Sequence, residues 1–369
     1  MIYLNNAATS FPKPECVGKA MLKAITSPPG EHLRGGFGSF DVFQAVREEL
    51  ARLIGAENPG RIALGCNATW ALNTAIFGMD LREGDIVVST KAEHNSVLRP
   101  LEALKNRGIQ VILVDTDRQG RVDTGSWKAA VQTYKPRLAI AAHASNVTGA
   151  VNEIAEMSRE VHALNGIFLL DSSQTIGCIP VNIKDLVPDM IAFTGHKYLL
   201  GPQGTGGLWV RENLELTPWM IGGTGIRSNL PHMPEEMPIH LEAGTGNEPS
   251  FYGLLAALQW LKENPLNFSG LMQKTRYLSD KIQKIGGNVI QVSGIRTPVI
   301  SFTLPGISVS EAGYLLKESC GIACRTGLHC APEIFPCLGI PESIRLSLSR
   351  FTDYEEIEAV IQALEAILY

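Results

Sequence analysis

The chain has 369 residues, of which 45% are hydrophobic and 19% are charged, and its net charge at pH 7 is -5. A chain of this length and composition is expected to fold compactly into two domains. The acidic balance and the absence of long Lys/Arg runs argue against nucleic-acid binding. No stretch approaches the roughly 18 consecutive apolar residues of a membrane span, and the start at Met1 lacks the layout of a signal peptide. We therefore expect a cytoplasmic protein without membrane contact.

The seven cysteines predict free thiols. An odd number without a secretion signal argues against a disulfide framework. Four of them fall between Cys320 and Cys337, but their spacing lacks the paired Cys-x-x-Cys of structural zinc sites. We therefore expect no metal site and at least one reactive thiol.

Through most of the first 210 residues, short apolar runs alternate with segments of helical period. This alternation is typical of an α/β domain in which helices connect parallel strands. Strands are predicted at 61–65, 85–90, 109–114, 137–142, 167–171, 189–193 and 206–210. Helices are predicted near 15–26, 68–79, 95–107, 123–133 and 153–164. The first of these helices could pack on either domain.

Residues 211–248 lose this periodicity and are rich in proline and glycine, which predicts a long ordered loop. From Pro249 the helical period returns, and a smaller α+β domain is expected. Its predicted helices after the first are at 269–284, 308–318 and 353–367, and its strands are at 288–292, 298–303, 321–325 and 344–348. We expect a large domain over 16–248 and a small domain over 249–369, completed by residues 1–15.

The most informative motif is Thr194-Gly195-His196-Lys197, which follows a predicted strand and precedes a glycine-rich turn. Partial burial at such a place lowers the pKa of a lysine amine and suits it to form an imine with a carbonyl group. An isolated lysine after a strand is more often an ordinary surface residue. The interpretation therefore depends on its companions.

Companion side chains follow three other predicted strands. The carboxylate of Asp171 ends one strand and suits a protonated ring nitrogen, although a helix cap is the alternative. His94 follows another strand and can cover a planar ring or carry a proton, although a lone histidine is more often structural. Ala68 and Thr69 begin a helix, where N–H groups and a hydroxyl can bind a phosphate.

The carboxyl ends of parallel strands meet at one edge of a sheet, so these side chains are expected to converge on one crevice. The converging set is Thr69, His94, Asp171, Gln174, His196 and Lys197. A phosphate cradle, a ring cover, a carboxylate and an imine-forming lysine are what pyridoxal 5'-phosphate requires. A nicotinamide cofactor is disfavoured, because no complete Gly-x-Gly-x-x-Gly joins a strand to a helix.

The sequence resembles the class V, fold-type I pyridoxal-phosphate enzymes, and within them the cysteine desulfurases and selenocysteine lyases. The resemblance runs along the whole chain. It rests on Asn5-Asn6-Ala7-Ala8-Thr9, Ala92-Glu93-His94-Asn95, Ser145-Asn146-Val147-Thr148-Gly149, Asp171-Ser172-Ser173-Gln174, Thr194-Gly195-His196-Lys197, Glu242-Ala243-Gly244-Thr245 and Arg325-Thr326-Gly327-Leu328-His329-Cys330-Ala331. The last motif looks like the Arg-x-Gly-His-His-Cys-Ala signature of the group II (SUF-type) desulfurases, with Leu328 in place of the first histidine.

The resemblance implies a large domain with a mixed, mostly parallel sheet, a smaller α+β domain, and a role for each matched residue. Lys197 would bind the cofactor covalently, His94 would stack on its ring, and Asp171 would pair with the ring nitrogen. The other implied cofactor contacts are Ala68, Thr69, Asn146, Gln174, Thr194 and His196. Thr245 would reach the cofactor phosphate of a neighbouring subunit, which implies a homodimer. The implied substrate contacts are Asn6, Ala7, Asn146, Arg325 and Arg345.

The reaction implied by the resemblance is cysteine desulfuration. Lys197 or His94 would move the Cα proton of L-cysteine, its sulfur would pass to Cys330 as a persulfide, and L-alanine would leave. Arg325 and His329 would favour the thiolate of Cys330. The persulfide would serve sulfur mobilisation through an acceptor protein, as in iron–sulfur cluster assembly.

Three alternatives remain open at this stage. L-selenocysteine could replace L-cysteine as the substrate, or the chain could be another class V aminotransferase or lyase that does not depend on Cys330. A scaffold without catalysis is disfavoured, because none of the matched catalytic residues is lost. Cys324 and Cys337 are candidates for a resolving thiol beside Cys330.

Overall fold

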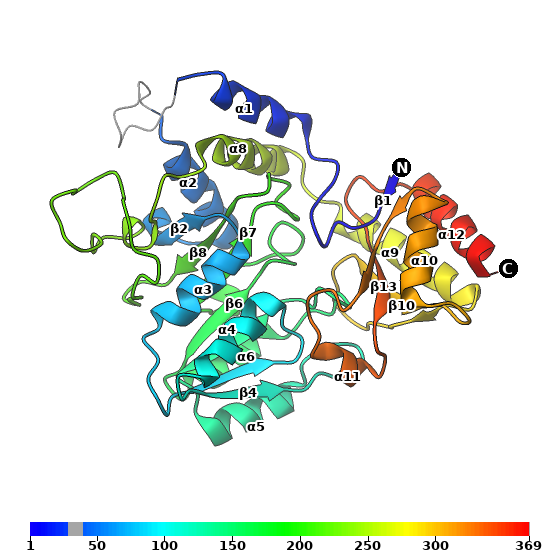
Figure 1. Ribbon diagram of the computed structural model, residues 1–369, viewed down its shortest axis with the longest axis horizontal. Helices are drawn as coiled ribbons and strands as arrows, with labels where there is room; N and C mark the ends of the chain where they lie inside the picture. The colour runs from blue at the N-terminus through cyan, green and yellow to red at the C-terminus, as the bar shows by residue number, and fades with distance from the viewer. Residues whose placement is uncertain (29–39, 369) are drawn as a thin grey trace.

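The computed structural model describes residues 1–28 and 40–368. A seven-stranded sheet and a four-stranded sheet stand next to each other, each packed against helices, and both ends of the chain lie beside the smaller sheet (Figure 1). This is the arrangement of a large α/β domain and a smaller α+β domain that the sequence predicts.

The large sheet has the strand order β2-β8-β7-β6-β5-β3-β4. Its strands are β2 (Ile62–Gly65), β3 (Ile86–Thr90), β4 (Gln110–Val114), β5 (Leu138–Ala142), β6 (Ile167–Asp171), β7 (Met190–Thr194) and β8 (Gly206–Val210). β8 is antiparallel to both of its neighbours, whereas all other pairs are parallel. β2 therefore runs in the same direction as β7. As a result, the carboxyl ends of β2, β3, β5, β6 and β7 lie at one edge.

Helices cover both faces of this sheet, which explains why its central strands are apolar along their whole length. One face is covered by α2 (Val42–Ile54), α5 (Thr124–Tyr134), α6 (Ile154–His162) and α8 (Glu248–Glu263). The other face is covered by α3 (Ala68–Gly78) and α4 (Asn95–Lys105). Two short segments, η2 (Pro59–Arg61) and α7 (Ile183–Leu186), complete the connections.

One helix of the large domain was missed by sequence reasoning. α2 has no counterpart among the predicted elements, although Val46, Leu50 and Ile54 follow a helical spacing and are buried. α8 begins at the expected domain boundary, but Phe251 and Leu254 pack into the core of the large domain. α1 (Glu15–Ile25) packs on α8, so it too lies with the large domain. α8 therefore packs with the large domain, and the domain boundary at residue 249 stays a prediction.

The small domain is built on an antiparallel sheet of order β12-β13-β10-β9. Its strands are β9 (Asn288–Val289), β10 (Val299–Thr303), β12 (Arg325–Gly327) and β13 (Ser343–Ser347). Its main helices are α9 (Phe268–Lys284), α10 (Val309–Glu318) and α12 (Tyr354–Leu368). The single strand predicted at 321–325 is split, because β11 (Ile322–Ala323) pairs instead with β1 (Ile2–Tyr3).

A small apolar cluster joins the two domains close to the carboxyl edge of the large sheet. Ala92 and Val147, which follow β3 and β5, pack with Ile334 and Phe335 of α11 (Ile334–Leu338). The segment that carries Cys330 immediately precedes α11 and is thereby held near this edge. Among the described residues, no helix has the length and apolar character needed to cross a membrane.

Candidate active site

A cavity of about 240 Å³ lies at the carboxyl edge of the large sheet, and we term it the Lys197 cavity. It is lined by residues of both domains. Those that the sequence predicted are Ala7, Ala68, Thr69, His94, Asn146, Asp171, Gln174, Thr194, His196, Lys197, Arg325 and Arg345. Residues that are up to 338 positions apart thus meet because five strands of the sheet end at the same edge.

Lys197 follows β7, as its motif predicted. Burial lowers the pKa of its amine to about 8, although the charge of Asp171 raises it. At pH 7 to 8 the neutral amine is therefore far more abundant than for an exposed lysine. A neutral amine is the form that attacks a carbonyl carbon.

His94 is the N-cap of α4, and its position is fixed by hydrogen bonds at one ring nitrogen. Its Nδ1 accepts from the Ser96 amide at 3.0 Å and lies 2.8 Å from the Ser96 hydroxyl. The Ser96 hydroxyl also lies 2.7 Å from that of Thr69, which joins the starts of α3 and α4. Burial and the neighbouring Lys197 lower the pKa of His94 to about 4, so its ring is neutral. Ser96 was missed from the sequence, although a hydroxyl two residues after a helix cap could have suggested it.

Four buried polar atoms of residues that line this cavity have no hydrogen-bond partner among the residues that the structure describes. They are Nδ1 of His196, Oε1 of Gln174, Oγ of Ser173 and Nε of Arg345. Unpaired buried polar groups are costly, so such a cluster in a cavity indicates a polar ligand. Ser173 was not predicted, although it lies beside Asp171 and donates its amide to the Asp171 carboxylate at 2.9 Å.

These residues fit pyridoxal 5'-phosphate. The start of α3 and the His196 ring can hold a phosphate, Asp171 can pair with a ring nitrogen, and Lys197 supplies the amine. Gln174 has its amide nitrogen committed to the Ala7 carbonyl at 2.9 Å. Its unpaired Oε1 can only accept a hydrogen bond, so a ligand at this atom would have to supply the donor.

Of the two adjacent residues predicted to contact the substrate, Ala7 lines the cavity and Asn6 does not. Ala7 lines the cavity, and its amide donates to the Ser347 hydroxyl at 2.8 Å. The Asn6 side chain does not line it, because its Nδ2 donates to the Ser347 carbonyl at 2.9 Å and its Oδ1 accepts from the Phe11 amide. Within this chain the Asn6 side chain therefore secures the segment that presents Ala7, and its substrate contact stays a prediction.

Two arginines place positive charge in the cavity. Arg345 is buried on β13, and its Nη1 donates to the Asn146 carbonyl at 2.8 Å. Burial, reinforced by the charge of Arg325, lowers the pKa of Arg345 to about 10, which still leaves it protonated at pH 7. The Asn146 side chain donates to the His329 carbonyl at 2.8 Å. A small carboxylate is the ligand that such a pair of guanidinium groups suits.

Cys330 lies in a turn in which His329 and Cys330 both have positive φ, at 49° and 59°. Arg325 Nη2 lies 2.8 Å from the Cys330 sulfur. The Asn95 amide at the start of α4 donates to the Cys330 carbonyl at 2.7 Å. Cys330 is not part of the cavity wall, but Arg325 is, so one guanidinium connects the thiol to the cavity.

His329 does not carry the positive charge that was expected to favour the Cys330 thiolate. Its ring is buried, its Nε2 lies 2.9 Å from the Ser343 hydroxyl, and burial lowers its pKa to about 2. A neutral ring cannot supply the positive charge expected beside Cys330. Among these two neighbours, the stabilising charge comes from Arg325 alone.

Two of the other cysteines are poorly suited to nucleophilic attack. Burial raises the pKa of Cys324 to about 11 and that of Cys178 to about 12, which disfavours their thiolates. Cys337 lies on α11, with its sulfur 4.0 Å from Asp115. Over residues 1–28 and 40–368, no group of His, Cys, Asp and Glu is arranged to hold a metal ion.

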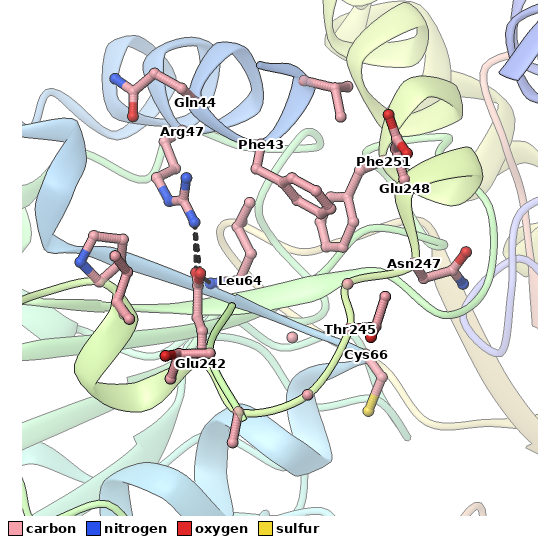
Figure 2. A pocket seen from close by; sticks show the side chains of 18 of the residues that line it. Phe43, Gln44, Arg47, Leu64, Cys66, Glu242, Thr245, Asn247, Glu248 and Phe251 are labelled. Carbon is pink, nitrogen blue, oxygen red and sulfur yellow. Dashed lines mark hydrogen bonds and ion pairs between the residues drawn. The ribbon is translucent and has the colours of Figure 1, made fainter. Parts of the chain in front are cut away.

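Thr245 lies outside the Lys197 cavity. It lines a second cavity of about 420 Å³, which we term the Thr245 cavity, together with Phe43, Arg47 and Glu242 (Figure 2). Within one chain, therefore, Thr245 is not brought together with the other predicted cofactor contacts.

The fold and the site define a class of protein. The family model described as aminotransferase class-V matches residues 2–360, so the chain belongs to the class V aminotransferases. Its relatives narrow this class. The chain is 30% identical to a probable cysteine desulfurase of Methanothermobacter thermautotrophicus, over 99% of this chain and 94% of that protein. It is 32% identical to a probable cysteine desulfurase of Chlamydia muridarum, over 100% of this chain and 94% of that protein.

Solved structures agree with this assignment. The cysteine desulfurase of Thermococcus onnurineus, solved as the apo form, matches with a TM-score of 0.90 and 26% identity, covering 100% of this chain and 94% of that one. The cysteine desulfurase CsdA of Escherichia coli, in an S-sulfonic acid form, matches with a TM-score of 0.88 and 26% identity, covering 99% and 94%. The chain is a member of the cysteine desulfurase family, and its fold is that of the fold-type I enzymes. The resemblance to the class V enzymes and to the cysteine desulfurases is confirmed.

Proposed function

We propose that the protein is a pyridoxal-phosphate-dependent cysteine desulfurase that converts L-cysteine to L-alanine and leaves a persulfide on Cys330. The observation that carries this proposal is the contact between Arg325 and the Cys330 sulfur, at 2.8 Å, because Arg325 also lines the cavity that holds Lys197. A thiol is thus held next to a site suited to amino-acid chemistry, where it can receive sulfur.

Each part of the cavity has a task in this proposal. Arg345 and Asn146 bind and orient the substrate carboxylate, with Ala7 forming part of the wall. When bound, pyridoxal 5'-phosphate withdraws electrons from the substrate and makes its Cα proton acidic. Lys197 takes that proton, because its lowered pKa of about 8 suits a base near neutral pH. His94, with a pKa near 4, stays neutral and covers the ring.

Sulfur transfer is balanced without a further oxidant or reductant. The Cys330 sulfur attacks the substrate sulfur, a sulfur–sulfur bond forms, and the carbon–sulfur bond of the substrate breaks. The electron pair of the broken bond stays with the substrate carbon, which gains a proton and becomes the methyl group of L-alanine. Cys330 then carries the transferred sulfur as a persulfide, which an acceptor protein removes.

A homodimer of the group II (SUF-type) kind in the cytoplasm, with Thr245 reaching the neighbouring subunit's cofactor phosphate, completes the proposal. The separation of Thr245 from the Lys197 cavity within one chain supports this arrangement. Delivery of the sulfur to iron–sulfur cluster assembly is part of the same proposal.

The test is to record the visible spectrum with pyridoxal 5'-phosphate, add L-cysteine, and count alanine and protein-bound persulfide. Cys330→Ala is compared with Cys320→Ala, which removes an exposed thiol elsewhere. We expect equal amounts of alanine and persulfide from the wild type and from Cys320→Ala, and no persulfide from Cys330→Ala. If Cys330→Ala still forms alanine, the protein is a lyase that does not depend on Cys330. If it prefers L-selenocysteine to L-cysteine, it is a selenocysteine lyase.

A further inference from the structure

A partly buried ion pair lies in the wall of the Thr245 cavity and lines no part of the Lys197 cavity. Arg47 Nη2 is 2.7 Å from both carboxylate oxygens of Glu242. The Arg47 side chain is 7% exposed and that of Glu242 is 24% exposed. Figure 2 shows Arg47 of α2 pointing toward Glu242, which follows η3 (Ile239–Leu241).

Both members of the pair are also bound to β2. The Leu64 amide donates to Glu242 Oε1 at 2.6 Å, and Arg47 Nε donates to the Ile62 carbonyl at 3.1 Å. The pair therefore attaches two elements, α2 and the segment from Glu242, to the first and third residues of a single strand. That strand leads directly into Asn67, Ala68 and Thr69, which start α3.

The segment from Glu242 to Asn247 is held at its far end as well. A Cβ atom on Gly246 would lie 2.5 Å from the Phe43 ring, so the backbone is pressed against α2 at that point. Asn247 caps α8 by accepting from the Ser250 amide at 3.4 Å. Between these ends, the Gly244 amide donates to the Gly223 carbonyl at 2.7 Å. Thr245 thus lies in a short stretch of backbone with a fixed point on each side.

The contribution of this ion pair to folding stability is a weak explanation for its presence. Burial raises the pKa of Glu242 even though Arg47 lowers it, which means that the carboxylate loses hydration here. Apolar residues of similar size often stabilise a buried position as well as an ion pair does. A charge-assisted hydrogen bond from Arg47 Nη2 to Glu242, with Arg47 Nε bound to the Ile62 carbonyl, differs from apolar contact in fixing the direction of both side chains.

We infer that the Arg47–Glu242 pair is a positioning device that holds Thr245 at a set place relative to β2 and thereby controls how tightly pyridoxal 5'-phosphate is retained. The inference rests on the proposed function, since it takes Thr245 as a phosphate ligand. It assigns positioning roles to Arg47 and Glu242, which touch neither the substrate nor the cofactor.

The test combines Glu242→Gln with a matched control, Glu212→Gln. Glu212 pairs at 3.8 Å with Arg61, which precedes β2, and is 60% exposed, so the same change there leaves the Thr245 segment untouched. Glu242→Gln keeps the acceptor for Leu64 but removes the charge that holds Arg47. The dissociation constant of pyridoxal 5'-phosphate is measured by absorbance titration of the cofactor-free protein.

We expect Glu242→Gln to raise this dissociation constant about tenfold and Glu212→Gln to leave it within about twofold. Thr245→Ala is expected to weaken binding to a similar degree. The double variant Glu242→Gln/Thr245→Ala is expected to bind no more weakly than Thr245→Ala, because residues that act through one contact are not additive. Additive losses, or equal effects of Glu242→Gln and Glu212→Gln, would overturn the inference.

A second measurement needs no cofactor. Amide hydrogen exchange over residues 243–246 of the cofactor-free protein should be faster in Glu242→Gln than in the wild type and unchanged in Glu212→Gln. Unchanged exchange in Glu242→Gln would also overturn the inference. A wild-type protein that does not take up pyridoxal 5'-phosphate would defeat the proposed function, while the exchange experiment would still decide whether the pair holds the segment.

Discussion

Arg325 Nη2 lies 2.8 Å from the sulfur of Cys330, and this contact connects a residue of the cavity wall with a thiol outside it. His329, the other positively chargeable neighbour, is neutral in its buried position. Arg325 is therefore the group that can stabilise negative charge as the sulfur reacts.

Replacing Arg325 by leucine is expected to slow alkylation of Cys330 by iodoacetamide about tenfold, because a charge-assisted hydrogen bond to the sulfur is lost. Arg325→Lys should retain part of the rate. The measurement is mass spectrometry of modified Cys330 against time, with the exposed Cys320 as internal reference. Equal alkylation rates in the wild type and Arg325→Leu would show that the contact does not activate the thiol.

Lys197 leads to a prediction about pH. Because its pKa is lowered to about 8, the rate at which the cofactor-free protein captures pyridoxal 5'-phosphate should rise from pH 6.5 and level off above about pH 8. An ordinary lysine would still gain neutral amine up to about pH 10.4. Borohydride reduction followed by peptide mapping should place the covalent link on Lys197. Capture by Lys197→Ala at the wild-type rate would contradict the assignment.

Glu93 is fully buried beside His94, and burial raises its pKa to about 8 despite its hydrogen bond from Thr90. The folded protein therefore keeps this proton between pH 4.5 and 8, where the unfolded chain has lost it. Since the unfolded chain binds fewer protons, stability falls as the pH rises through this window. Above pH 8 the full loss of folding stability caused by burying Glu93 is present.

Glu93→Gln should remove this pH dependence. Its effect on the free energy of unfolding should be more favourable at pH 8 than at pH 5, by on the order of 3 kcal/mol. Thermal melting of the cofactor-free protein at the two pH values measures the change. The exposed-pair variant Lys128→Met serves as control, since it should shift both melting temperatures little. The same stability difference at both pH values would mean that Glu93 is not protonated in the folded state.

Arg345 should act mainly on substrate binding. Arg345→Lys keeps the charge but loses the bidentate geometry, so KM for L-cysteine is expected to rise about tenfold with a smaller change in kcat. The visible spectrum of the cofactor-bound enzyme should be preserved. An unchanged KM would remove Arg345 from the substrate site.

Gly206 of β8 packs against Asn67, the N-cap of α3, where the cofactor phosphate is expected to bind. A Cβ atom there would lie 2.7 Å from Asn67 Cα and 2.8 Å from the Phe193 carbonyl oxygen. Gly206→Ala should therefore destabilise the protein by roughly 1–3 kcal/mol and weaken binding of pyridoxal 5'-phosphate. Gly18→Ala, at a helical glycine with nothing within 4 Å, should instead stabilise by about 0.5–1 kcal/mol. Melting curves and cofactor titration of the two variants provide the comparison.

The positions of the main elements could be predicted because hydrophobic periodicity is a property of neighbouring residues. The predicted strands of the large sheet match β2 to β8 within one residue at each end. Lys197 and Asp171 were recognised because both stand where a strand ends. The same reasoning missed α2, although its buried residues recur at helical intervals.

The sequence by itself determined the alternation of strands and helices, the residue types at the strand ends, and the motifs that identify the family. The tertiary structure alone decided that the Asn6 side chain is bound to Ser347 and Phe11, that His329 is neutral, and that Arg325 contacts Cys330. It also decided that Arg47 pairs with Glu242, 195 positions later in the chain. These outcomes depend on burial and on contacts between distant segments, and local periodicity contains no information about which segments pack together.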